Sequence, residues 1–348
     1  MPRPLVLTAD PALLDDLLRL CAAAGAEPDV VDHAEAAAPL WRDAPLAVVG
    51  ADAIGRLVAS GLPRRAGLLL VGNDLDDAGL WRQAVAVGAE HVLFLPDAEP
   101  WLVERFADAA ADPGRRGRIV AVVGARGGAG ATSFSVALAL AGARAGRRTI
   151  LVDADAYGGG IDLALGAEDV AGPRWDAFAE GPPPAGGEAL TATLPRCGEV
   201  TVLAWPRTST PLIPAANVEA ALASARRAGD LVVVDVARSF DEACRVALSV
   251  CDVAFVVCPA EVRACASGRR IADTVALFAP DVRVVARGPA PGDLDASIVA
   301  EALGLPLAGW LEKEPDIDVA LDEGRPPGRG GRGPLAELCG RLVAELLP

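Results

Sequence analysis

The first 111 residues alternate between short apolar runs and longer segments with the hydrophobic spacing of helices. The apolar runs predict strands at residues 4–7, 46–49, 67–71 and 91–95. Two longer segments predict helices, at residues 11–24 and 100–111. Strands that alternate with helices form parallel sheets with helices on both faces. The pattern therefore predicts an α/β domain over residues 1–111.

The same alternation resumes after a short polar stretch of Pro, Gly and Arg. We interpret this stretch, residues 112–118, as a linker, and we expect a second α/β domain over residues 119–348. A helix is predicted over residues 134–145, and apolar runs predict strands at residues 119–123, 148–152, 230–235, 254–257 and 282–286.

The last apolar segment predicts a helix over residues 334–347. Its apolar side chains share one face, at Leu335, Leu338, Leu342, Val343 and Leu346. Helices that dock on membranes usually carry basic residues on the polar face, whereas this one mixes arginine with glutamates. We therefore expect the helix to pack on its own domain.

Composition narrows the classes of function. The 348 residues suit two domains, and 52% of them are hydrophobic, which is enough for buried cores. A net charge of −15 argues against non-specific binding of nucleic acid. The start of the chain does not have the pattern of a signal peptide, and no uninterrupted apolar run reaches membrane-spanning length. We expect a cytoplasmic protein.

Seven cysteines, an odd number, also suit a reducing compartment. Four of them recur every seven residues, but the segment passes through helix, strand and helix, so the spacing does not place them on one face. We expect small buried side chains and no metal site at Cys244, Cys251, Cys258 and Cys265.

A glycine-rich stretch follows the first strand of the second domain. From Gly124 it reads G-A-R-G-G-A-G-A-T-S. Glycines let backbone N–H groups approach phosphates, and the helix expected at its end adds partial positive charge. The usual pattern has lysine immediately before Thr132, but here that residue is Ala131. The only lysine of the chain is Lys313, and Arg126 is the only basic residue of the stretch.

We predict that this stretch binds phosphate groups. The residues of the predicted site are Gly124, Arg126, Gly127, Gly128, Ala129, Gly130, Ala131, Thr132 and Ser133.

Acidic residues follow two of the predicted strands. Asp153 and Asp155 end one strand, and Asp235 ends another. Beside a phosphate loop, one such carboxylate can hold Mg²⁺ through water and another can orient an attacking water. The combination of loop and acids is more specific than either part alone.

These motifs resemble the ParA/MinD family of deviant P-loop ATPases, in particular its CpaE-like branch and the actinobacterial septum-site-determining proteins. Family members read K-G-G-x-G-K-T-T in the loop. By position, Arg126 stands at the signature lysine that crosses a dimer interface, and Ala131 stands at the phosphate-loop lysine. Thr132 falls at the Mg²⁺ ligand, Asp155 at the water-orienting acid and Asp235 at the Walker B acid, which also serves Mg²⁺.

The resemblance implies a P-loop domain with a mainly parallel sheet, ATP and Mg²⁺ as cofactors, and a homodimer. It also implies division or secretion-apparatus proteins as partners, at the cytoplasmic face of the membrane or the septum. Because the lysine is replaced, we expect weak ATP binding and weak or absent hydrolysis. Ala286, at the position of the family's adenine-contacting asparagine, weakens binding further.

Several functions remain open. We favour a scaffold that regulates septum placement; the alternative is a working ATPase, with Arg126 in the charge role, that positions Flp pilus or secretion machinery. A dinucleotide-binding oxidoreductase is a third class. Gly124, Gly127 and Gly130 recur every third residue, as in a dinucleotide-binding fingerprint, and Asp153 could bind a ribose. A short-chain dehydrogenase would also need Tyr and Lys four residues apart, and the only tyrosine, Tyr157, is far from the only lysine.

The first domain resembles a response-regulator receiver with a flavodoxin-like fold, because G-A-E-H-V-L-F-L-P looks like that family's last strand. The receiver's chemical groups are replaced: the acidic pair by Thr8 and Ala9, the phosphoacceptor by Gly50 and the lysine by Leu95. Phosphoryl transfer then has neither a bound cation nor a nucleophile. We expect nearby Asp52 to be a solvated loop acid.

Overall fold

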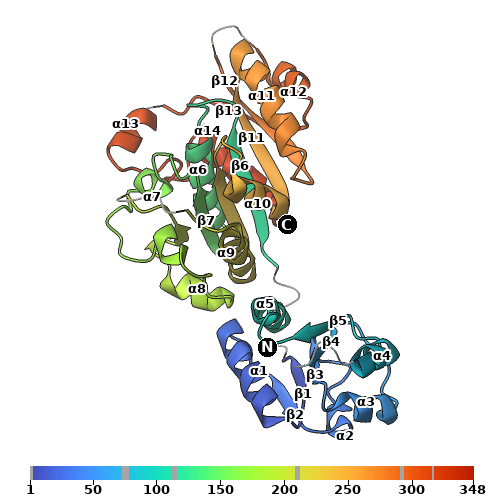
Figure 1. The fold of residues 1–348 in the computed structure, drawn as a ribbon. Helices are drawn as coiled ribbons and strands as arrows, with labels where there is room; N and C mark the ends of the chain where they lie inside the picture. Colours follow the sequence, from blue (N-terminus) through green and yellow to red (C-terminus); the bar gives the residue numbers. More distant parts are fainter. Residues whose placement is uncertain (1–2, 73–77, 112–115, 208–211, 291–293, 316) are drawn as a thin grey trace. The chain divides into compact units, whose positions relative to one another are not determined.

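The structure, a computed structural model, describes residues 3–72, 78–111, 116–207, 212–290, 294–315 and 317–348 (Figure 1). The chain forms two compact units. Unit 1 comprises Met1–Arg116 and Pro184–Ala189, and unit 2 comprises Gly117–Pro183 and Leu190–Pro348. Residues 112–115, most of the predicted linker, lie outside the described residues.

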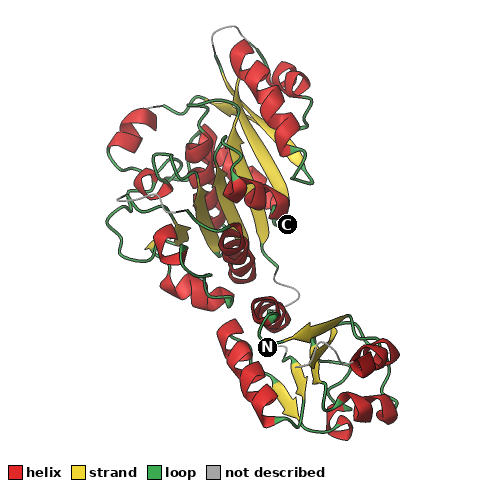
Figure 2. Cartoon of the chain, viewed as in Figure 1, coloured by secondary structure: helices red, strands yellow, loops and turns green. Residues whose placement is uncertain are grey.

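Unit 1 is a parallel five-stranded sheet with helices on both faces (Figure 2). In sheet order the strands are β2 (Asp29–Val31), β1 (Leu5–Leu7), β3 (Ala47–Gly50), β4 (Leu68–Gly72) and β5 (His91–Phe94). One face packs against α1 (Pro11–Ala24) and α5 (Glu99–Ala110). The other face packs against α2 (Ala34–Ala37), α3 (Ile54–Ser60) and α4 (Ala78–Val87). The predicted receiver-like fold is confirmed.

Unit 2 is built on an eight-stranded sheet that is parallel except at one edge, where β8 runs antiparallel to β9. In sheet order the strands are β13 (Leu307–Glu312), β12 (Val282–Gly288), β11 (Val253–Pro259), β6 (Arg118–Gly124), β10 (Leu231–Val236), β7 (Thr149–Ala154), β9 (Val200–Leu203) and β8 (Arg196–Cys197). The mainly parallel P-loop fold predicted from the sequence is confirmed.

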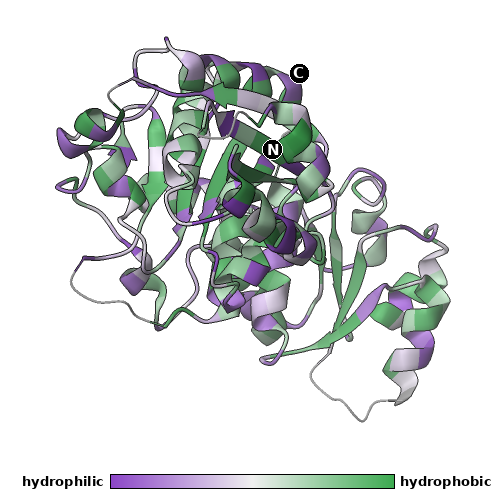
Figure 3. Ribbon diagram, turned by 90° about the horizontal axis from the view of Figure 1, so that it is seen from above, coloured by the Kyte–Doolittle hydropathy of each residue, from purple (hydrophilic) through white to green (hydrophobic). Residues whose placement is uncertain are grey.

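Helices cover both faces of this sheet, so its central strands are apolar along most of their length. Figure 3 shows these strands coloured as hydrophobic. One layer contains α6 (Ala131–Arg144), α7 (Ile161–Ala164) and α14 (Pro334–Leu346). The other contains α9 (Ala215–Ala228), α10 (Glu242–Val250), α11 (Val262–Val275) and α12 (Ala296–Leu303). Shorter elements are η1 (Trp175–Phe178), α8 (Gly187–Thr193) and α13 (Ile317–Asp322).

The close approach of α6 to the sheet depends on Gly142. A Cβ atom at this residue would lie 2.7 Å from both the Leu231 and the Thr149 side chains. Glycine therefore lets this end of α6 lie directly on the central strands β10 and β7.

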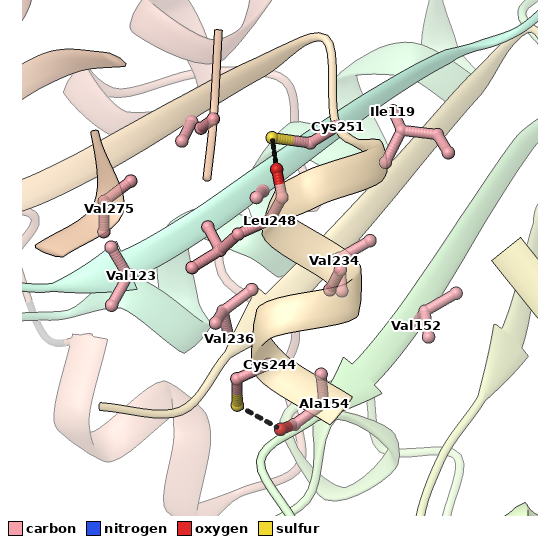
Figure 4. Packing of buried hydrophobic residues seen from close by; sticks show 14 of the residues in the cluster. Ile119, Val123, Val152, Ala154, Val234, Val236, Cys244, Leu248, Cys251 and Val275 are labelled. Carbon is pink, nitrogen blue, oxygen red and sulfur yellow. Dashed lines mark hydrogen bonds between the residues drawn. The ribbon is translucent and has the colours of Figure 1, made fainter. Parts of the chain in front are cut away.

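The four regularly spaced cysteines are buried in different elements, as predicted. Cys244 lies in α10 and Cys258 in β11, whereas Cys265 lies in α11 and Cys251 caps α10. Figure 4 shows the Cys244 thiol donating to the carbonyl oxygen of Ala154 at 3.4 Å, among the apolar side chains of this core. The cysteines fill space in the core of unit 2.

The C-terminal helix α14 packs on its own domain, as predicted from its apolar face. Leu335, Leu338, Leu342, Val343 and Leu346 are all buried in the same cluster as α6. Among the described residues, no helix combines the length and the apolar character needed to cross a membrane.

We expect Leu338→Ala to lower the free energy of unfolding by about 2–5 kcal/mol, because it removes buried methyl groups and leaves a cavity. The side chain is 1% exposed and fills the space above Gly309, where a Cβ would lie 2.5 Å from Leu338 Cδ1. Urea unfolding measures the change. Leu277→Ala, at a leucine that is 78% exposed, is the control and should change stability by less than about 0.5 kcal/mol. Equal effects of the two substitutions would contradict the packing of α14.

Candidate phosphate-binding site

The glycine-rich stretch joins the central strand β6 to the N-terminus of α6. Gly128 and Gly130 have φ angles of 69° and 91°, in the left-handed region that favours glycine. Helix α6 begins at Ala131, and no side chain caps it. The first N–H groups of α6 are therefore left for an anion, and the helix dipole favours negative charge there. The predicted strand, loop and helix are confirmed.

Asp235 connects the end of β10 to the first turn of α6. Its carboxylate accepts hydrogen bonds from Thr132 Oγ1 at 2.7 Å and from Ser135 Oγ at 3.0 Å. Burial raises the pKa of Asp235 to about 6, although the two hydroxyl donors act in the opposite direction. The two residues predicted to serve Mg²⁺, Thr132 and Asp235, are thus in direct contact.

Two further acids lie at the same edge of the sheet. Asp153 lies opposite Asp235 in the register of the neighbouring strands β7 and β10. Its side chain accepts hydrogen bonds from the N–H groups of Asp155 at 3.0 Å and Ile161 at 3.2 Å. Burial, together with the charge of Asp235, raises the pKa of Asp153 well above its ordinary value. Asp155, the predicted water-orienting acid, is only partly buried.

This set of oxygens fits a magnesium ion that is shared with a nucleotide. No group of three or more His, Cys, Asp or Glu side chains is placed to hold a metal within the described ranges. Mg²⁺ usually keeps several waters and takes one or two protein oxygens plus phosphate oxygens. Thr132 and Asp235 could supply the protein oxygens, and phosphates at the N-terminus of α6 would supply others.

Arg126 forms an ion pair with Glu261, a contact that the sequence did not predict. Its Nη2 donates to both carboxylate oxygens of Glu261, at 2.9 and 3.0 Å, and its Nη1 donates to the carbonyl of Gly127 at 2.8 Å. Glu261 is the residue that precedes α11. The arginine predicted to stand at the dimer-crossing position is therefore engaged within its own chain.

Two other arginines approach the loop, and the sequence analysis missed both. Arg287 Nη1 donates to the carbonyl oxygens of Ala129 at 3.0 Å and Gly128 at 3.4 Å. Arg238 Nη2 lies 3.4 Å from the position of a Cβ built on Gly127. Arg287 is the second-last residue of β12, and Arg238 lies two residues after the end of β10, so a position at a strand end was the only signal in the sequence. Lys313, in contrast, is exposed just after β13.

In the receiver-like unit, Asp52 lies where the side chain of the missing phosphoacceptor would be. Asp52 accepts from Thr8 Oγ1 at 2.7 Å and from the N–H of Ala9 at 2.7 Å. A Cβ on Gly50 would lie 2.3 Å from Asp52 Oδ1, so Asp52 occupies the space of an acceptor side chain. Asp10, the remaining acid after β1, caps α1 by accepting from two N–H groups.

Comparisons with known proteins agree with this architecture. A family model described as "Rv3660c-like, CheY-like N-terminal domain" matches residues 7–118. Uncharacterized protein Rv3660c of Mycobacterium tuberculosis H37Rv is 38% identical over 328 residues, which cover 91% of each chain. Uncharacterized protein MT3760 of M. tuberculosis CDC 1551 matches equally well.

Solved structures resemble unit 2. A ParA family ATPase from Chlorobium tepidum has a TM-score of 0.59 at 14% identity and covers 67% of this chain and 99% of its own. The septum site-determining protein MinD from Pyrococcus horikoshii, complexed with Mg-ADP, has a TM-score of 0.56 at 18% identity, with coverages of 66% and 95%. A chain of the MinC:MinD cell division protein complex from Aquifex aeolicus has a TM-score of 0.56 at 18% identity and covers 67% of this chain and 98% of its own. The fold expected from the ParA/MinD resemblance is confirmed.

Because Asp235 is buried, we expect the free energy of unfolding to depend on pH in the acidic range. Its folded-state pKa of about 6 lies above the ordinary 3.8. The folded protein therefore binds more protons than the unfolded chain between these values, and stability is lost as pH rises through this window. In metal-free buffer near pH 7.5, we expect Asp235→Asn to raise the free energy of unfolding by about 1–3 kcal/mol, because the amide keeps the shape without the buried charge.

Urea unfolding with EDTA across the acidic range measures this effect. The gain should shrink as pH falls and disappear near pH 4, about the ordinary pKa of aspartate. Asp176→Asn, at an exposed aspartate of η1, serves as the control and should show no such gain. An Asp235→Asn protein that is less stable than wild type near pH 7.5 would overturn the prediction.

The receiver-like unit should not accept a phosphoryl group from small-molecule donors, because Gly50 offers no nucleophile and Asp52 is held by Thr8 and Ala9. Mass spectrometry after treatment with acetyl phosphate tests this expectation. A stable adduct in wild type that is lost in Asp52→Ala would show that Asp52 serves as an acceptor after all.

Proposed function

The chain belongs to the Rv3660c-like family, and we propose that it is a ParA/MinD-type spatial regulator of septum placement and cell division. In this proposal the nucleotide site works as a scaffold with weak or absent ATP hydrolysis. One observation supports it above the others: the phosphate loop and the Thr132–Asp235 contact are retained, while Ala131 stands in place of the lysine. The fold relatives include the septum site-determining protein MinD and a chain of a MinC:MinD cell division protein complex.

We assign the roles as follows. The N-terminus of α6 would bind the phosphates of ATP, Thr132 and Asp235 would hold Mg²⁺, and Asp155 would orient a water. Bound Mg²⁺ would neutralise phosphate charge. A lost charge-assisted hydrogen bond costs about 1.5–3 kcal/mol, or roughly 10- to 150-fold in affinity, so ATP binding should be weak. The site would then report nucleotide occupancy without rapid turnover.

The domain assignment in this proposal is a receiver-like domain at residues 1–111, a linker at 112–118 and a P-loop domain at 119–348. The receiver-like domain, which has no acceptor, would serve as a docking module. The expected assembly is a homodimer that binds division proteins at the cytoplasmic face of the membrane or the septum. For Arg126 to contact a second copy, its ion pair with Glu261 would have to open.

Overproduction in the native host tests the proposed role. We expect elongated cells with misplaced or missing septa, because a scaffold acts by stoichiometric binding and its dose matters. Asp155→Ala should leave this phenotype largely intact, since it removes only the group that would orient water. Fluorescence microscopy at matched protein abundance is the measurement, with Leu338→Ala as a control for loss of folding.

Two results would count against the proposal. Normal septa, with the tagged protein spread evenly through the cell, would shift the assignment to pilus or secretion machinery. Loss of the phenotype in a folded and abundant Asp155→Ala protein would show that a nucleotide cycle drives the effect.

A further inference from the structure

The loop that lacks its lysine is surrounded by arginines from three different parts of unit 2. Arg126 belongs to the loop itself, Arg238 follows β10, and Arg287 lies near the end of β12. Arg126 and Arg287 donate hydrogen bonds to carbonyl oxygens of the loop, and the two differ in whether a carboxylate already neutralises their charge.

The positive charge of Arg126 is not available to a bound phosphate, because a carboxylate already neutralises it. Both oxygens of Glu261 accept from its Nη2, and the pair is only about one-third exposed, at 37% and 34% of the two side chains. Arg126 Nε is buried and has no partner among the described residues. Binding a phosphate here would first require breaking a charge-assisted pair.

Arg287 differs in its partners. Its backbone sits at the carboxyl end of β12, where its carbonyl accepts from the N–H of Ala260 at 2.8 Å, which fixes the strand end beside β11. Its Nη1 bonds only to the loop carbonyls of Gly128 and Ala129. Within the described part of the chain its guanidinium makes no ion pair and no other hydrogen bond, so no carboxylate neutralises its charge.

The guanidinium of Arg287 lies close to Ala131, the position at which the phosphate-loop lysine usually stands. A Cβ built on Gly130, the residue immediately before Ala131, would lie 3.0 Å from Arg287 Nη1. The glycine therefore leaves room for the guanidinium next to the first turn of α6. A guanidinium carries five N–H donors in a planar fork that suits phosphate oxygens, and the Nε and Nη2 donors of Arg287 form no bonds with described residues.

We infer that Arg287, a residue of β12, replaces the phosphate-loop lysine as the cation that binds nucleotide phosphates in this chain. The inference rests on the proposed nucleotide site. Arg287 reaches the loop from a strand that lies beyond β11, whereas the usual lysine projects from the first turn of the helix. Part of the lost charge is thus supplied from outside the loop, and the loop carbonyls hold the guanidinium in place.

Isothermal titration calorimetry with Mg-ADP and with inorganic pyrophosphate tests the inference on the full chain. We expect Arg287→Ala to weaken binding of both probes by about tenfold or more, the effect of losing a charge-assisted contact. The matched control is Arg283→Ala, an arginine four residues earlier in β12 that pairs with Asp281 and Glu345. Its affinity should stay within about twofold of wild type, a change of less than half a kcal/mol.

The double variant Ala131→Lys/Arg287→Ala provides a rescue that a merely structural role of Arg287 would not show. A lysine at its usual position should recover most of the lost affinity. If Arg287→Ala is not folded by circular dichroism, Arg287→Gln replaces it in the comparison.

The outcomes separate this inference from the proposed function. Wild-type affinity retained in Arg287→Ala, or binding seen only after Ala131→Lys is introduced, would overturn the role of Arg287 and leave the nucleotide site standing. No binding of either probe by wild type or by Ala131→Lys would overturn both.

Discussion

The hydrogen bonds from Thr132 and Ser135 to the buried carboxylate of Asp235 hold the site together. They connect the end of β10 to the first turn of α6, and therefore fix where the uncapped N–H groups of that helix point. The same contact places a negative charge where burial disfavours it, next to a second buried acid, Asp153. A site with this charge balance favours a cation, which suits a magnesium ion shared with phosphates.

Both units keep an α/β fold while the charged groups expected of their relatives are replaced. In unit 1, Asp52 and Asp10 satisfy backbone and hydroxyl donors of the same unit. In unit 2, Glu261 satisfies Arg126. Apolar burial in the strands and helices supplies the stability of such folds, so the chemical groups at strand ends can change without loss of the architecture.

The sequence predicted the parts of the molecule that depend on local pattern. Continuous apolar runs marked the buried central strands, and the glycine stretch marked the turn into α6. Four strands, β2, β8, β9 and β13, were missed. The first three are only two to four residues long, and β13 is only partly buried, which weakens the apolar pattern. The contacts of Arg126 with Glu261 and of Arg287 with Ala129 join residues 135 and 158 positions apart, and only the strand order of the sheet brings them together.

Steady-state release of phosphate from Mg-ATP tests most directly the central claim that the fold is retained without rapid catalysis. The purified full chain should release phosphate no faster than its Asp155→Ala variant, even at ATP concentrations that occupy the site. Brisk turnover by wild type that Asp155→Ala abolishes would contradict the claim, and its loss in Arg126→Ala would identify Arg126 as a working replacement for the lysine.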